Sequence, residues 1–189
     1  IYYMCEASRV ATWAEFLLMN PMPATYAGCI TTLCDPTALL SSFSQLDNLL
    51  ECHPNVWFTF GLHPHNSRYW DAKIESRLVE LCSHPRCVGW GEIGIDATSE
   101  KKGGSAEDEQ VLCFLRQLEL AANFCAEKPI QIHFRGDANA LFSLLDGVPR
   151  TQKLHLHSWG VTDVAATKRL MDAFPNLYFG WTGVVTKGT

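Results

Sequence analysis

Apolar runs alternate with amphipathic stretches along most of the chain. Runs bounded by glycine, proline or polar turns predict six buried strands, at residues 26–33, 56–61, 87–91, 129–133, 153–157 and 177–181. Helical spacing and helix-start signals predict helices at residues 7–19, 35–51, 71–82, 105–126, 139–145 and 163–173. Strands that are apolar throughout are typical of parallel sheets covered by helices. The alternation therefore predicts parallel βα units with right-handed crossovers.

Two of the predicted helices begin at recognisable capping sequences. Asp35 precedes Pro36, which places a capping carboxylate before a proline at the first helical position. Ser105 precedes Asp108 by three residues, and this spacing predicts a capping box at the start of the longest helix.

The length of the chain limits the choice of architecture. A chain of 189 residues, of which 47% are hydrophobic, can form one domain with a sizeable core. Periodicity alone leaves two α/β architectures open, a doubly wound sheet and a (β/α)8 barrel. A complete barrel takes about 250 residues. If the fold is a barrel, we expect it to be incomplete within this chain.

The charge of the chain restricts how it can contact nucleic acid. The formal net charge is −5 at pH 7, which excludes a protein that coats nucleic acid with a broad basic surface. A nuclease stays compatible with this charge, because a metal ion and a few local cations can hold phosphates at one site.

The lack of targeting signals and the spacing of the cysteines predict an intracellular protein. The chain begins at Ile1 and contains neither a signal-peptide pattern nor an apolar run of about 18 residues. Its eight cysteines contain no C-x-x-C pair, which favours reduced core cysteines over disulfides. We therefore expect a cytoplasmic or nuclear protein that does not span a membrane.

Three polar residues stand at or near the ends of consecutive apolar runs. Glu92 follows Val-Gly-Trp-Gly, His133 closes Pro-Ile-Gln-Ile-His, and His157 closes Lys-Leu-His-Leu-His. Barrel enzymes build their sites at the carboxyl ends of parallel strands, so these side chains should lie side by side. A buried carboxylate needs a partner or a metal, and two imidazoles with a carboxylate suit a catalytic divalent ion. The arrangement favours the barrel and predicts a metal site.

Four motifs in order resemble the TatD family of metal-dependent deoxyribonucleases. They are GLHPH at 61–65, GEIGID at 91–96, PIQIHFR at 129–135 and HSWG at 157–160. The resemblance covers the chain from about Tyr26 to the last residue. It implies a TIM (β/α)8-type barrel in which the predicted strands are the second to the seventh, so that residues 1–189 form a single domain lacking the first and last strands.

The resemblance also implies the metal ligands. Glu92 matches the carboxylate that bridges two metal ions and takes part in catalysis. His133 and His157 match the histidines that hold one of these ions. The resemblance does not fix the metal, which can be zinc, magnesium or manganese. His155 has no counterpart as a ligand and is interpreted as an interior histidine.

Further residues are implied around these ligands. His63 and His65 would bind substrate at the mouth of the site, with His63 on a phosphate; a helix cap or a surface turn is the alternative for His65. Arg135 would bind phosphate through its planar guanidinium, with a surface ion pair as the alternative. We assign a catalytic role to Asp96, in the loop after Glu92, where it would orient water or support the ligands.

The chain departs from the family pattern at several points. The family's H-x-H pair and its late aspartate, which hold the other metal and activate water, have no counterpart here. The acidic residue expected five positions after Arg135 is Ala140.

The functional prediction is a metal-dependent nuclease that hydrolyses phosphodiester bonds of DNA, with RNA as another substrate. Tyr69, Trp70 and Trp159 follow predicted strands and could stack on bases, although aromatic residues more often pack. Two alternatives stay open: a catalytically impaired fragment or binding protein on the same barrel, and a metal hydrolase with a different substrate.

Overall fold

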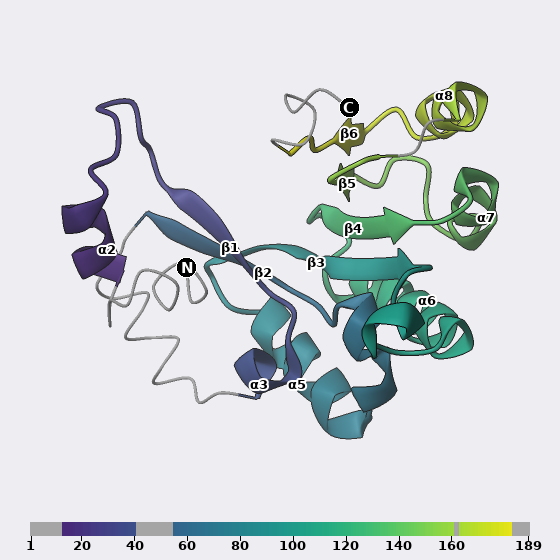
Figure 1. Ribbon diagram of the computed structural model, residues 1–189, viewed down its shortest axis with the longest axis horizontal. Coiled ribbons are helices and arrows are strands. Elements are labelled where there is room, and N and C mark those ends of the chain that lie inside the picture. The colour runs from purple at the N-terminus through teal and green to yellow at the C-terminus, as the bar shows by residue number, and fades with distance from the viewer. Residues whose placement is uncertain (1–12, 41–54, 161–162, 183–189) are drawn as a thin grey trace.

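Six parallel strands form one curved sheet in which the strand order follows the chain (Figure 1). The computed structural model describes residues 13–40, 55–160 and 163–182. The strands are β1 (Cys29–Leu33), β2 (Val56–Phe60), β3 (Cys87–Asp96), β4 (Ile130–Arg135), β5 (Leu154–His157) and β6 (Leu177–Phe179). Each predicted strand is confirmed, and consecutive parallel neighbours bring all carboxyl ends to one edge.

Helices precede β1 and follow each of the strands β1 to β5 along the chain. They are α2 (Trp13–Met19), α3 (Pro36–Leu39), the 3₁₀ helix η1 (Pro64–Tyr69), α5 (Ala72–Cys82), the 3₁₀ helix η2 (Glu100–Lys102), α6 (Glu107–Phe124), α7 (Ala138–Leu144) and α8 (Val164–Ala173). Figure 1 shows α5, α6, α7 and α8 following one another along the sheet. Ile74, Leu78 and Leu81 illustrate the reason, because their spacing gives α5 one buried apolar face.

The long strand β3 differs from the prediction. It runs from Cys87 to Asp96 rather than ending at Gly91, so Asp96 is its last residue and not part of a loop. Gly91 and Gly94 explain the length, because both have positive φ values, +150° and +144°, at close approaches to β4. A Cβ at Gly91 would lie 2.6 Å from the Gln131 carbonyl oxygen, and one at Gly94 would overlap the His133 carbonyl oxygen.

The capping predictions have different outcomes. The Asp35 carboxylate accepts a hydrogen bond from the Thr37 amide, as predicted, and α3 begins at Pro36. The capping box on Ser105 is wrong, because α6 begins one residue later and the Glu109 carboxylate accepts from the Ala106 amide. Ser105 instead donates to the His65 carbonyl and accepts from the Arg68 amide, which ties this loop to η1.

Parts of the predicted helices lie outside the described residues. The prediction of a helix at 7–19 is confirmed from Trp13 to Met19, and the helix predicted at 35–51 is described only as α3, from Pro36 to Leu39. Residues 1–12 and 41–54 are not described.

The hydrophobic core lies between the sheet and its helices. The largest fully buried side chains include Trp90, Phe58, Phe60, Phe114 and Phe174. The phenyl rings of Phe58 and Phe60 stack with centroids 5.6 Å apart. Such packing holds the strand ends at fixed positions, which a functional site at this edge requires.

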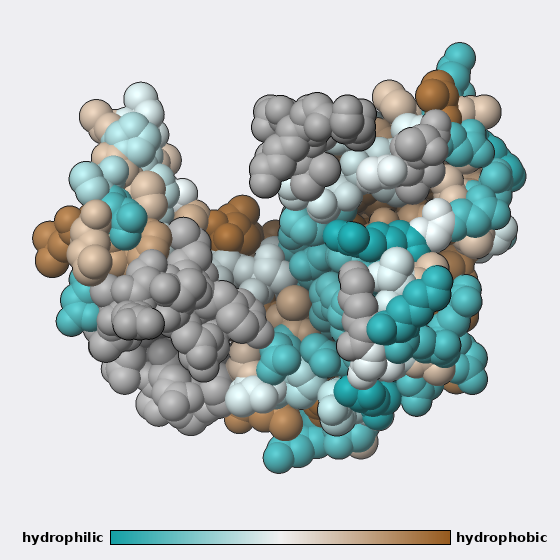
Figure 2. All heavy atoms as spheres, viewed as in Figure 1, coloured by the Kyte–Doolittle hydropathy of each residue, from teal (hydrophilic) through white to brown (hydrophobic). Residues whose placement is uncertain are grey.

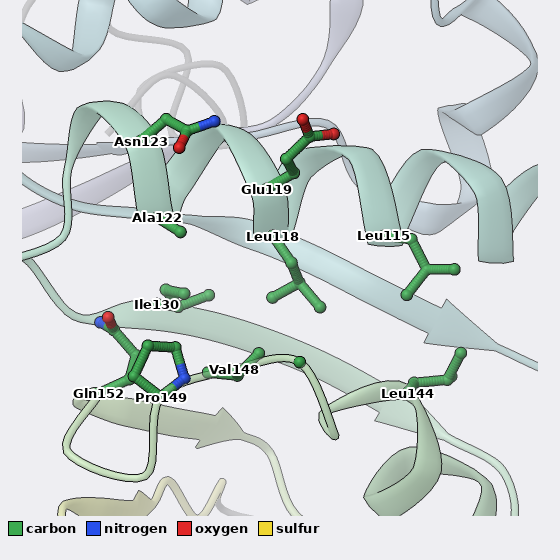
Figure 3. A pocket seen from close by; sticks show the side chains of 11 residues that line it. Leu115, Leu118, Glu119, Ala122, Asn123, Ile130, Leu144, Val148, Pro149 and Gln152 are labelled. Atoms are coloured by element: carbon green, nitrogen blue, oxygen red, sulfur yellow. The ribbon is translucent and has the colours of Figure 1, made fainter.

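The helical layer contains one small surface cavity (Figure 3). It has a volume of about 310 Å³ and lies between α6 and the segment joining α7 to β5. Figure 3 shows Leu118 and Val148 facing it, beside Ile130 at the start of β4. The cavity therefore lies toward the amino end of the sheet, away from the predicted site.

The surface is uneven in its polarity (Figure 2). Hydrophobic residues reach the surface around α2 and β1, where Leu18, Met19 and Ile30 are exposed. The helical layer on the opposite side of the view is mostly hydrophilic. Across the residues that the structure describes, no helix is both long enough and apolar enough to cross a membrane.

Candidate active site

Glu92 lies where the pairing of β3 with β4 is irregular. Trp90 pairs with Ile130 and Ile93 with Ile132, so β3 has one more residue than β4 over this stretch. The peptide bond between Gly91 and Glu92 is cis. Glu92 thus sits within the strand, at the irregularity, and its side chain is only 13% exposed.

His133 lies between two carboxylates. Its Nδ1 is 2.8 Å from Glu92 Oε1, and its Nε2 is 3.3 Å from Asp96 Oδ2. The ring is nearly buried, and its backbone pairs with Gly94 of β3 on one side and His157 of β5 on the other. Contacts at both nitrogens fix the orientation of this ring.

His157 approaches the same carboxylate from β5. Its Nε2 is 3.7 Å from Glu92 Oε1, and its ring centroid is 6.5 Å from that of His133. His155 lies two residues earlier on the same face, with its ring centroid 6.3 Å from that of His157. Burial and the nearby His157 lower the pKa of His155, which favours a neutral interior imidazole.

The turn after β2 brings a third histidine to the cluster. His63 caps η1 by accepting a hydrogen bond from the His65 amide at Nδ1. Ligand atoms of His63, Glu92 and His133 all lie within 4.8 Å of one another. Burial lowers the pKa of His63 to about 4, although Glu92 acts in the opposite direction. His63 is therefore neutral near pH 7, as a metal ligand must be.

Asp96 connects the cluster to the mouth of the site. Its side chain is buried, and its Oδ2 is 2.8 Å from His65 Nε2 in addition to its contact with His133. Its Oδ1 accepts hydrogen bonds from the amide and the hydroxyl of Thr98. Asp96 thus uses both oxygens to fix groups around the cluster.

Both carboxyl groups are ionised at neutral pH despite their burial. Burial raises the pKa of Glu92, but the hydrogen bond with His133 and the nearby imidazoles outweigh it, so the net pKa falls below its ordinary 4.5. Burial also raises the pKa of Asp96, but hydrogen bonds from Thr98 and His65 bring it well below its ordinary 3.8. The centre of the site therefore carries negative charge that attracts cations.

Arg135 ends β4 beside this cluster. Its Nε lies 3.9 Å from Asp96 Oδ2, and 52% of its side chain is exposed. A cavity of about 770 Å³ opens next to it, between the loops that follow β3, β4, β5 and β6. Arg135 thus has one end near the buried carboxylate and a free guanidinium surface toward solvent.

Comparison with known proteins identifies the family. The family described as TatD related DNase matches residues 22–189. The human protein named 3′-5′ RNA nuclease TATDN2 is 34% identical over 184 residues, which are 96% of this chain and 23% of that protein. The chain belongs to the TatD related DNase family.

Other TatD proteins match over shorter stretches. The 3′-5′ ssDNA/RNA exonuclease TatD of Escherichia coli K12 is 32% identical over 107 residues, which are 57% of this chain and 39% of that protein. The corresponding protein of Escherichia fergusonii is 33% identical over 115 residues. The chain therefore spans less than half the length of each of these curated relatives.

The fold also agrees with a solved TatD structure. YjjV, a TatD homologue from Escherichia coli K12, matches with a TM-score of 0.73 and 20% identity, covering 92% of this chain and 63% of YjjV. The prediction of a TatD barrel-type fold is thereby confirmed.

The residues present fit the metal that the TatD family requires. Imidazole nitrogens and a carboxylate oxygen are ligands for zinc and manganese, and His63, Glu92 and His133 offer such atoms within 4.8 Å of one another. The coarse prediction of a divalent metal site is thus supported. The ligand set and the metal identity stay predictions.

The structure places the predicted site residues in one region. Glu92, His133 and His157 converge at the strand edge, with Asp96 behind them and Arg135 beside them. His65 is turned toward Asp96, whereas His63, predicted to bind phosphate, faces the metal-type cluster. The role of each residue stays a prediction.

The sequence does not predict the roles of Gln110 and Gln117, two glutamines that bind the backbone beside the site residues His63 and Asp96. Gln117 donates to the Leu62 carbonyl and accepts from the Leu62 amide, and Gln110 accepts from the Asp96 amide. Both side chains are buried on the inner face of α6. The available signal was their spacing, because a seven-residue separation puts both on the same face as Phe114.

Proposed function

We propose that this chain supplies a metal-dependent nuclease site that hydrolyses phosphodiester bonds in single-stranded DNA or RNA. The observation that carries the proposal is the convergence of Glu92 with His133 and His157 at the carboxyl edge of a parallel sheet. Glu92 Oε1 lies 2.8 Å from His133 Nδ1 and 3.7 Å from His157 Nε2. The printed names of the relatives, a 3′-5′ RNA nuclease and a 3′-5′ ssDNA/RNA exonuclease, support the substrate class.

We assign the metal ligands within this proposal. Glu92, His133 and His157 would hold one divalent ion, and His63, whose ring nitrogen is near Glu92 and His133, would serve as a further ligand. When bound, a divalent ion supplies positive charge that stabilises a phosphoryl oxygen as negative charge develops on it. Zinc and manganese suit the nitrogen ligands better than magnesium, which prefers oxygen.

The remaining side chains have positioning and binding roles. Asp96 holds the rings of His133 and His65 through its Oδ2. Arg135 is free to bind a phosphate of the strand next to the scissile bond, because more than half of its side chain is exposed. His65 would stand at the mouth of the site with one nitrogen held by Asp96.

The proposal is tested by cleavage of end-labelled single-stranded DNA and RNA with manganese, zinc or magnesium. We expect metal-dependent cleavage that EDTA stops and that Glu92→Gln reduces at least 10-fold, because an amide cannot supply the carboxylate charge. Glu119→Gln, an exposed acid on α6, is the matched control and should leave the rate unchanged.

Two outcomes would refute the proposal. The first is a chain that is folded by circular dichroism but cleaves no oligonucleotide with any of the three metals. The second is cleavage that persists in EDTA or in Glu92→Gln, since either result would place the chemistry elsewhere.

A further inference from the structure

A cavity adjoins the metal-type cluster. It is the cavity of about 770 Å³ lined by loops after four strands, and its size falls within the range of about 300–1,000 Å³ typical of small-molecule pockets. Arg135 lines this cavity and also lies 3.9 Å from Asp96, so the cavity begins where the cluster ends. A substrate held at the cluster would extend into it.

Charged residues of both signs line the cavity. Among the described residues that line it, Arg135 is the sole cation and lies on the side of the cluster. The two acids are Asp137 and Asp163, which cap α7 and α8 by accepting hydrogen bonds from Asn139 and Ala166 amides. Their negative charge disfavours phosphate away from Arg135, whereas an uncharged group with N–H donors is acceptable there.

Two tryptophans give the cavity an aromatic floor and an exposed aromatic wall. Trp159 is 4% exposed and packs between Phe134 and Phe179, with ring centroids 6.3 and 5.5 Å away. Its amide donates to the Gly180 carbonyl, which joins the loops after β5 and β6. Trp181 also lines the cavity, but 62% of it is exposed. A large exposed aromatic surface beside a fixed floor is suited to stacking.

We propose that this cavity binds one unstacked nucleotide, with its base against Trp181 and its phosphate at Arg135. The proposal rests on the proposed function and adds a reason for selecting single strands. A base that is paired within a duplex cannot enter a pocket without leaving its stack, whereas a single strand presents its bases freely. Because every base has a π face, stacking of this kind tolerates any sequence.

The proposal is tested by binding rather than cleavage, so that it can fail independently of the nuclease proposal. Fluorescence anisotropy in EDTA would compare a labelled single-stranded hexanucleotide, the same strand with abasic residues, and a duplex. We expect Trp181→Ala to weaken binding of the intact strand roughly 5- to 100-fold, as stacked aromatics do. Binding of the abasic strand and the duplex should change little.

Two further variants distinguish a loss of stacking from a nonspecific loss of structure. Trp181→Phe should retain most of the affinity because it keeps an aromatic face. Tyr178→Ala removes an exposed aromatic residue of β6 that does not line the cavity, and it should leave all affinities unchanged. Equal weakening of intact and abasic strands, no effect of Trp181→Ala, or no measurable binding of the intact strand by the parent chain would each overturn the proposal.

Discussion

Asp96 is the residue on which the geometry of the cluster depends. It is 1% exposed and contacts His65 and His133 through one oxygen. Carboxylates behind metal-binding histidines fix the ring orientation and raise its basicity, and their loss typically costs about 10- to 100-fold in metal affinity. Asp96 has this position relative to His133, which is a proposed ligand.

We therefore expect Asp96→Asn to weaken manganese or zinc binding by about 10- to 100-fold. Asparagine keeps the shape but removes the charge that faces the two imidazoles. Calorimetric titration measures the affinity, and Asp172→Asn, an exposed acid on α8, serves as the control. An unchanged metal affinity in Asp96→Asn would show that Asp96 does not support metal binding.

Gly94 is a second position at which a single added atom, a Cβ, would disturb the structure. Its φ of +144° is unfavourable for other residues, and an added Cβ would overlap the His133 carbonyl. We expect Gly94→Ala to lower the free energy of unfolding by about 1–3 kcal/mol or more, as strained backbone positions do. Urea denaturation provides the measurement. Gly147→Ala is the matched control, because nothing lies within 4 Å of a Cβ built there, and an equal loss in both variants would contradict the prediction.

At the scale of elements, the helix α6 contacts the site through the buried side chains of Gln110 and Gln117. Gln117 pairs with both backbone groups of Leu62, immediately before the His63 turn. Gln117→Leu would leave a buried amide and a buried carbonyl unpaired, at a cost of about 1–3 kcal/mol for each unsatisfied group. We expect a lower unfolding free energy and weaker metal binding together. Asn123→Leu, exposed on the same helix, should cause neither change.

A salt bridge between α5 and α6 predicts acid sensitivity. Glu75 interacts with Arg116, and the side-chain hydrogen bond from Arg116 lowers the pKa of Glu75 below its ordinary 4.5. Because the folded-state pKa is the lower one, this stabilisation is present above pH 4.5 and is lost as the pH falls through the folded-state value.

The expected result is an unfolding free energy that falls less steeply below pH 4.5 in Glu75→Gln than in the parent chain. Urea denaturation at several pH values from neutral to acidic would measure the slope. Parallel curves for the two proteins over the acid range would show that Glu75 does not contribute.

At the scale of the whole molecule, metal binding should be coupled to folding. The proposed ligands come from the turn after β2 and from β3, β4 and β5, and the unfolded chain does not hold them together. A ligand at 100 times its dissociation constant stabilises the folded state by about 2.7 kcal/mol. We expect a higher Tm with manganese or zinc, reversal by EDTA, and no increase in Glu92→Gln. A metal-induced shift of equal size in Glu92→Gln would contradict the ligand assignment.

The sequence by itself determined the order and type of the elements. Continuous apolar runs predicted all six strands because buried parallel strands have apolar residues on both faces. It also predicted that Glu92, His133 and His157 would meet, because parallel neighbours bring their carboxyl ends to one edge. Asp35 was predicted correctly as a cap because capping is local.

Only the tertiary structure decided how the site is assembled. The extent of β3 depends on glycines that allow β4 to approach, and an isolated strand pattern does not contain that contact. His63 joins the cluster through a turn whose direction is set by the packing of η1 against α6, with Ser105 recruited to hold the turn instead of capping α6. Gln110 and Gln117 acquired their roles because burial leaves the backbone groups of Asp96 and Leu62 dependent on α6 for hydrogen bonds. Local patterns thus fixed which chemical groups were available, and long-range packing fixed which of them face one another.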